Sequence, residues 1–164
     1  MQYTNAAATE IKQAQVPHNL FVAGVLIFNL LLTPAVIGMK IGMIGLLIPL
    51  ICSSLLLGYI FIRSRKTTTW FVDAHWRLAF MNSRWLMIGY AVSATLIFIA
   101  WLITLTLHDV NMKHILWTAL TRIALVPTVI AVLATAVMEA SAIPLVIKRE
   151  VPDKIAKAFP PPVQ

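Results

Sequence analysis

The chain has 164 residues, of which 60% are hydrophobic and only 12% are charged, and its mean hydropathy is +0.86. Soluble domains are about half apolar and about a quarter charged, so this composition excludes an ordinary soluble protein and indicates an integral membrane protein. The formal net charge is +7, and the placement of the basic residues decides what this charge means.

Four apolar segments are long enough to span a bilayer, which takes roughly 20 residues of helix for about 30 Å of hydrocarbon. The predicted spans cover residues 19–37, 41–62, 85–107 and 115–143. Because the first two are separated by a very short link, they should form an antiparallel hairpin. The sequence therefore predicts one all-α membrane domain over residues 1–164, a four-transmembrane-helix up-down bundle. We expect kinks at Pro49 and Pro127, and an end to the fourth span before Pro144.

The basic residues are distributed very unevenly over the two sides of such a bundle. One side receives ten of the 13 Lys and Arg residues: Lys12, Arg63, Arg65, Lys66, Arg77, Arg84, Lys148, Arg149, Lys154 and Lys157. The other side receives Lys40 and Lys113. This asymmetry predicts cytoplasmic termini, a basic C-terminal tail at residues 148–164 and contact with anionic lipids at the inner face. It accounts for the net charge without a nucleic-acid partner, and it suits a bacterial inner (plasma) membrane or another energy-transducing membrane.

The loop between the second and third spans contains an amphipathic segment at residues 69–82, without Gly or Pro. Its apolar residues fall at helical spacing, which predicts an inner helix, either at the level of the lipid headgroups or as an extension of the third span. The candidate lipid contacts or docking residues are Trp70, Phe71, Asp73, Trp76, Arg77, Phe80 and Arg84. An interfacial anchor without a partner and a docking site for another subunit both fit this pattern.

One face of the fourth span carries only small or polar residues. At about 100° per residue, seven of them fall within a strip about 80° wide: Thr121, Ala124, Thr128, Ala131, Thr135, Glu139 and Ala142. Membrane helices pack closely through small residues and hydrogen bonds, so the strip is predicted to be an interface for another helix or a partner.

The fourth span also contains two charges, Arg122 and Glu139. They lie about 25 Å apart along the helix and cannot pair with each other. Arg122 is expected to extend toward the headgroups or Asp109. Glu139 points toward the bilayer centre, and its expected partners are basic residues at the inner surface. A structural ion pair, a proton-coupled or substrate-binding role and a contact with a partner subunit all remain open for it.

Four histidines raise the question of a metal or haem site. His18, His75, His108 and His114 are all predicted at helix ends or in loops, whereas haem ligation in a bundle needs histidines inside the helices. We therefore expect solvated or headgroup-facing histidines, with no metal or cofactor. Motifs typical of zinc proteases, serine hydrolases and nucleotide-binding proteins are also lacking.

These features favour a non-catalytic accessory, structural or assembly subunit of a larger membrane protein complex, with other membrane subunits or copies of itself as partners. The alternative is a small oligomeric transporter or channel that uses Glu139 together with Thr121, Thr128 and Thr135. A lipid- or quinone-handling enzyme with Arg122 on a headgroup phosphate would also need a base and a nucleophile, which the sequence does not supply.

Overall fold

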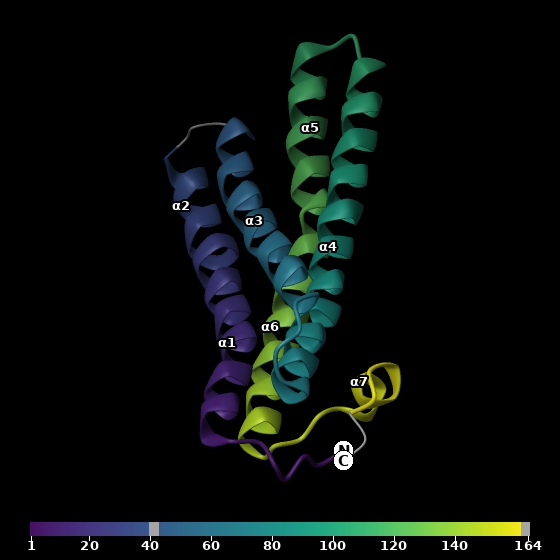
Figure 1. Ribbon diagram of the computed structural model, residues 1–164. Helices are drawn as coiled ribbons and strands as arrows, with labels where there is room; N and C mark the ends of the chain where they lie inside the picture. The colour runs from purple at the N-terminus through teal and green to yellow at the C-terminus, as the bar shows by residue number, and fades with distance from the viewer. Residues whose placement is uncertain (40–42, 162–164) are drawn as a thin grey trace. The chain divides into compact units, whose positions relative to one another are not determined.

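A computed structural model describes residues 1–39 and 43–161, and every named element in this part of the chain is helical. Four helices are long and apolar enough to cross a membrane: Ala8–Gly38, Ile44–Ser64, Trp70–Leu105 and Val110–Ile147 (Figure 1). The prediction of an all-helical, multi-pass membrane protein is thereby confirmed. Lys40, the predicted start of the second span at residue 41 and the last three residues of the predicted tail lie outside the described residues.

The first span begins eleven residues earlier than predicted. It consists of α1 (Ala8–Gly24), the π-helix η1 (Val25–Leu32) and α2 (Thr33–Gly38). The polar first turn is stable because the Glu10 carboxylate accepts a hydrogen bond from the Ala7 amide at 2.9 Å, close to the positive end of the helix dipole. The wide π turns directly precede Pro34, which lacks an amide hydrogen and crowds the preceding turn of an ordinary α-helix.

The second span consists of the short 3₁₀ helix η2 (Met43–Leu46) and α3 (Leu47–Ser64), which packs against α1 and η1. Pro49 lies in the first turn of α3, where a missing amide hydrogen breaks no helical hydrogen bond. The expectation of a mid-span kink at Pro49 was therefore wrong.

The third span is a single helix, α4 (Trp70–Leu105), of 36 residues. Thr68 precedes it and donates two hydrogen bonds to Asp73, one from its amide and one from its hydroxyl. The predicted inner helix at residues 69–82 is not a separate element but the first part of α4. The chain has no Gly or Pro between the two segments, so nothing interrupts the backbone hydrogen bonds.

The fourth span divides into α5 (Val110–Ala124) and α6 (Val126–Ile147), with a turn at Leu125 just before Pro127. The helix continues past Pro144, where we expected it to stop, because a proline removes only one backbone hydrogen bond and Lys148 still donates to the Pro144 carbonyl at 3.0 Å. Arg149 ends the helix in the left-handed conformation, with φ of 57°.

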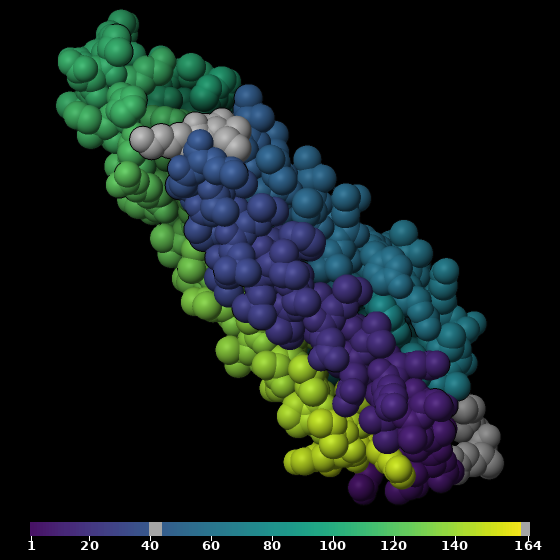
Figure 2. All heavy atoms as spheres, turned by 90° about the vertical axis from the view of Figure 1, so that its left-hand side faces the viewer, coloured from purple at the N-terminus to yellow at the C-terminus, as the bar shows by residue number. Residues whose placement is uncertain are grey.

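The chain divides into two compact units, which are described separately. Unit 1 comprises Met1–Ser83 and Ala136–Gln164, and unit 2 comprises Arg84–Thr135. In unit 1, the spheres of α1 lie against those of the C-terminal part of α6 and of α3 (Figure 2). The largest fully buried apolar side chains of this unit are Phe21, Phe71, Ile60, Val25, Val72, Val146 and Val151. In unit 2, Gly89 of α4 lies so close to α6 that an added Cβ would be 2.4 Å from the Cβ of Ala131.

The N-terminal residues are anchored within unit 1. The first residues pair with the segment that follows α6: Gln2 forms an antiparallel bridge with Glu150, and the Val151 amide donates to the Met1 carbonyl at 2.9 Å. The Met1 ammonium also binds Asp153 in the short helix α7 (Asp153–Ala158). We call residues 1–4 and 149–153 the terminal clasp.

Candidate functional site

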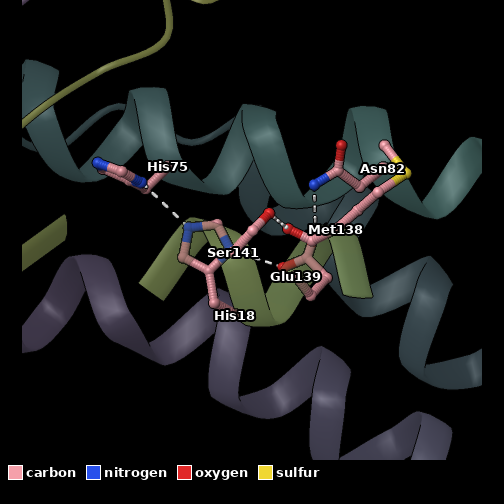
Figure 3. A network of polar contacts seen from close by, with 6 residues as sticks. All are labelled: His18, His75, Asn82, Met138, Glu139 and Ser141. Carbon is pink, nitrogen blue, oxygen red and sulfur yellow. Dashed lines mark hydrogen bonds and ion pairs between the residues drawn. The ribbon is translucent and has the colours of Figure 1, made fainter. Parts of the chain in front are cut away.

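Glu139 lies in the interior of unit 1 with 0% of its surface exposed. Its Oε2 is 2.6 Å from Nδ1 of His18 on α1, and its Oε1 accepts a hydrogen bond of 2.7 Å from the Asn82 amide on α4 (Figure 3). Arginine and lysine side chains at the inner surface, which we expected as partners, do not provide these contacts. Glu139 therefore connects three of the four spans through neutral or titratable side chains.

The contact network continues from His18 to a second histidine. Nε2 of His18 is 3.0 Å from Nδ1 of His75 on α4, and the two rings meet edge to face. Both histidines are 0% exposed. We call His18, His75, Asn82 and Glu139 the polar cluster. The prediction that all four histidines are solvated or headgroup-facing was thus wrong for these two, whereas His108 and His114 are exposed.

Helix periodicity explains why α4 contributes two members of the polar cluster. His75 and Asn82 are seven residues apart, which is about two turns, so both lie on the same face of α4. His18 was misplaced because the first span was predicted to begin at residue 19, whereas α1 already begins at Ala8 and places His18 in its interior. The signal that could have found the cluster was the spacing of His75 and Asn82 within a segment predicted as helical.

The contacts permit one arrangement of hydrogens in the polar cluster when Glu139 is ionised and both imidazoles are neutral. An ionised carboxylate only accepts hydrogen bonds, so in this arrangement Nδ1 of His18 carries the hydrogen that points at Glu139. With neutral imidazoles, Nε2 of His18 is then an acceptor, and Nδ1 of His75 must donate to it. This leaves Nε2 of His75 without a hydrogen, and this buried nitrogen has no hydrogen-bond partner.

The small-polar strip of the fourth span faces other parts of the same chain. In unit 2, the hydroxyl of Thr128 donates to Oγ of Ser93 at 2.8 Å and lies 3.3 Å from the Gly89 carbonyl. Thr135 is fully buried and donates to its own helix at the Ala131 carbonyl. Three other members are also buried, namely Ala124, Glu139 and Ala142, whereas Thr121, Ala131 and Thr128 are half-buried.

Arg122, in unit 2, is exposed. Asp109, which we considered as its partner, instead caps α5 by accepting hydrogen bonds from the amides of Asn111 and Met112 at 2.7 and 3.0 Å. No ion pair joins Arg122 to Asp109 among the residues that the structure places. The other alternative, that Arg122 extends toward the headgroups, stays a prediction.

The aromatic and basic residues of the inner segment are mostly covered by their own chain. Of the seven candidates, only Arg84 is exposed; Trp70, Phe71, Asp73 and Trp76 are buried, and Arg77 and Phe80 are half-buried. Phe159, after α7, accepts a hydrogen bond from the Trp70 indole at its carbonyl, and its ring lies 3.7 Å from the Arg77 guanidinium. The C-terminal segment covers much of this face, and the choice between an interfacial anchor and a docking site stays a prediction.

The polar cluster differs from a metal site in its geometry. Both nitrogens of His18 are already engaged with other side chains, and within residues 1–39 and 43–161 no group of three or more His, Cys, Asp or Glu side chains could hold a metal ion. What the cluster can do chemically is bind and transfer a proton, because imidazole and carboxylate groups in contact exchange protons readily.

Comparisons of this chain with protein-family models, with curated proteins and with solved structures find no match. The function must therefore be argued from the geometry of the chain.

Proposed function

We propose that this chain is a non-catalytic accessory, structural or assembly subunit of a larger membrane protein complex. The observation that carries the proposal is the difference in side-chain exposure between the two faces of α6. Thr135 and Glu139, on the polar face, are 0% exposed, whereas Ile130, Leu133 and Val137 are 61%, 54% and 69% exposed. A helix of this kind holds its own chain together with its polar groups and offers an apolar surface to lipid or to another membrane helix.

The same observation weighs against the transporter or channel alternative. That alternative needs Glu139 and the three threonines of the strip along a path, where water or a substrate can contact them. Thr128 is instead bonded to Ser93, Thr135 to its own helix and Glu139 to the polar cluster. The polar atoms of these groups form hydrogen bonds within one chain. This arrangement favours a structural role over the lining of a transport path.

Cytoplasmic termini and a bacterial inner or other energy-transducing membrane remain part of the proposal. The support is the ten basic residues that the chain order assigns to one side. The pairing of Met1 with Val151 is consistent with termini on a common side. A fluorescent or enzymatic reporter fused after residue 164 would test this, since its signal depends on the compartment.

The experiment that tests the proposal is the native mass of the protein after gentle extraction from its own membrane. A tag at the C-terminus is preferable, because the Met1 amino group binds Val151 and Asp153 in the terminal clasp. Co-migration with defined subunits in fixed ratios would support the proposal. A protein that migrates alone or as a small homo-oligomer would refute it.

A matched variant sharpens this experiment. Glu139→Gln preserves the shape of a fully buried side chain, so it leaves the outer surface unchanged. The same partners should therefore co-purify with this variant in the same ratios. By contrast, if Glu139 itself contacted a partner, this substitution would reduce the yield of that partner.

A further inference from the structure

The unpartnered nitrogen of His75 distinguishes the polar cluster from a purely structural clamp. Each polar atom of His18 in the cluster has a partner, as does each oxygen of Glu139, whereas Nε2 of His75 has none although the residue is fully buried. A buried basic nitrogen without a donor is costly in a protein interior. It is also a place where one proton can bind.

We propose that His75, His18 and Glu139 form a buried proton-transfer chain that takes up one proton at Nε2 of His75 and delivers it to the carboxylate of Glu139. The contacts needed for this are already in place at 3.0 and 2.6 Å, within hydrogen-bond reach for direct transfer. The proposal is independent of the accessory function, because it concerns groups with no exposed surface.

The proposed transfer takes three steps, and every hydrogen is accounted for. A proton binds the lone pair of Nε2 on His75, and the hydrogen on Nδ1 of that ring passes to Nε2 of His18. The hydrogen on Nδ1 of His18 then passes to Oε2 of Glu139. One proton has been taken up, the carboxylate has become a neutral carboxyl group, and both imidazoles are neutral again with their hydrogens on Nε2. Asn82 continues to donate to Oε1 throughout.

We assign proton uptake to the side of His75 that lies next to the terminal clasp. The backbone carbonyl of Glu150, in the terminal clasp, lies close to His75. Because Nδ1 of His75 is engaged with His18, a hydrogen on Nε2 is the one that this carbonyl can accept. The Phe71 ring, which stacks on Tyr3 of the clasp, lies edge to face against the same imidazole at 4.8 Å. The clasp thus covers the uptake end of the chain.

Other charged groups near this end are engaged elsewhere. Asp73, two residues before His75 on α4, accepts two hydrogen bonds from Thr68 and lies 3.9 Å from Arg63 at the end of α3. The guanidinium of Arg77 lies over the Phe159 ring. From α1, α4 and α6, the titratable groups that face one another are therefore His18, His75 and Glu139.

The wild-type protein tests the proposal directly. Nitrogen-15 NMR of histidine-labelled protein distinguishes Nδ1–H from Nε2–H imidazoles, and the carboxyl stretch in the infrared reports protonation of Glu139. We expect His18 and His75 to carry their hydrogens on Nδ1 at high pH. Both should change to Nε2 in the same pH step in which the carboxyl band appears. If the band appears while the tautomers stay unchanged, or if the rings are already Nε2–H at high pH, the proposal is refuted.

Two variants separate proton transfer from simple packing. In Glu139→Gln, the Asn82 donor holds the amide oxygen, so the amide NH₂ faces His18 and should fix both rings as Nε2–H at every pH. In His75→Phe, the uptake nitrogen is lost, and the tautomer change of His18 should be lost with it. A tautomer change of His18 that survives in His75→Phe would overturn the proposed route. His108→Gln and His114→Gln, which alter exposed residues only, identify the remaining signals and should leave the cluster unchanged.

Discussion

Replacing Glu139 by alanine should destabilise the protein far more than replacing it by glutamine. Alanine removes the acceptors of two buried donors, Nδ1–H of His18 at 2.6 Å and the Asn82 amide at 2.7 Å. Glutamine keeps the shape, accepts from Asn82 and can donate to His18 once that ring changes tautomer. The comparison therefore isolates the contribution of the two hydrogen bonds from that of the side-chain volume.

The magnitude follows from the number of donors left unpaired. A buried donor without a partner costs about 1–3 kcal/mol, which gives about 2–6 kcal/mol for the two donors in Glu139→Ala. Within a membrane or micelle the unfolded chain also finds polar partners, so the lower half of that range, about 2–4 kcal/mol, is expected. Glu139→Gln loses only the charged character of one contact and should cost about 1 kcal/mol or less.

The assay is reversible unfolding in mixed micelles of mild and denaturing detergent, followed by circular dichroism or tryptophan fluorescence. Val137→Ala is the matched control, because Val137 lies two residues away on the same helix and is 69% exposed. It should change the free energy of unfolding by less than about 0.5 kcal/mol. If Glu139→Ala proves no more destabilising than Glu139→Gln, the polar cluster does not hold α1, α4 and α6 together, and this part of the reasoning fails.

Three further measurements test other parts of the structure. Gly89→Ala should cost about 1–3 kcal/mol, because its Cβ would meet Ala131 at 2.4 Å, whereas Gly58→Ala, with nothing within 4 Å, should be neutral or slightly stabilising; equal effects would argue against the close approach of α4 and α6. The hydrogen bond from the N-terminal ammonium lowers the pKa of Asp153, so this contact stabilises the fold above the unfolded-state pKa and is lost as pH falls through the folded pKa. The stability difference between wild type and Asp153→Asn should thus vanish in acid, and a difference that grows on acidification would contradict this assignment. Hydrogen–deuterium exchange at the imidazole C2 position, measured by mass spectrometry, should be slow for the two histidines of the polar cluster and fast for the two exposed histidines; similar rates for all four would exclude the observed burial.

The sequence by itself determined the class of the protein and the number of its long helices. Apolar runs of about 20 residues have few alternatives to a membrane-spanning helix, because a backbone in hydrocarbon must satisfy its hydrogen bonds internally. Local chemistry also indicated that one face of the fourth span would pack closely, and in unit 2 this face lies against Gly89 and Ser93. The ends of the helices were harder to predict from the sequence. Glu10 stabilises an earlier start of α1, and α6 continues past Pro144.

Only the tertiary structure decided which polar groups meet. His18 and Glu139 are 121 residues apart in the chain, and His75 and Asn82 lie 57 residues from their partners in the cluster. A single sequence offers Glu139 several cations at the inner surface, and their charge made them the obvious partners. Burial reverses this preference, because the interior of unit 1 admits neutral imidazole and amide groups at a lower cost in desolvation than a free lysine or arginine. The same three-dimensional packing covers the aromatic inner segment with Phe159, a contact that no local pattern announces.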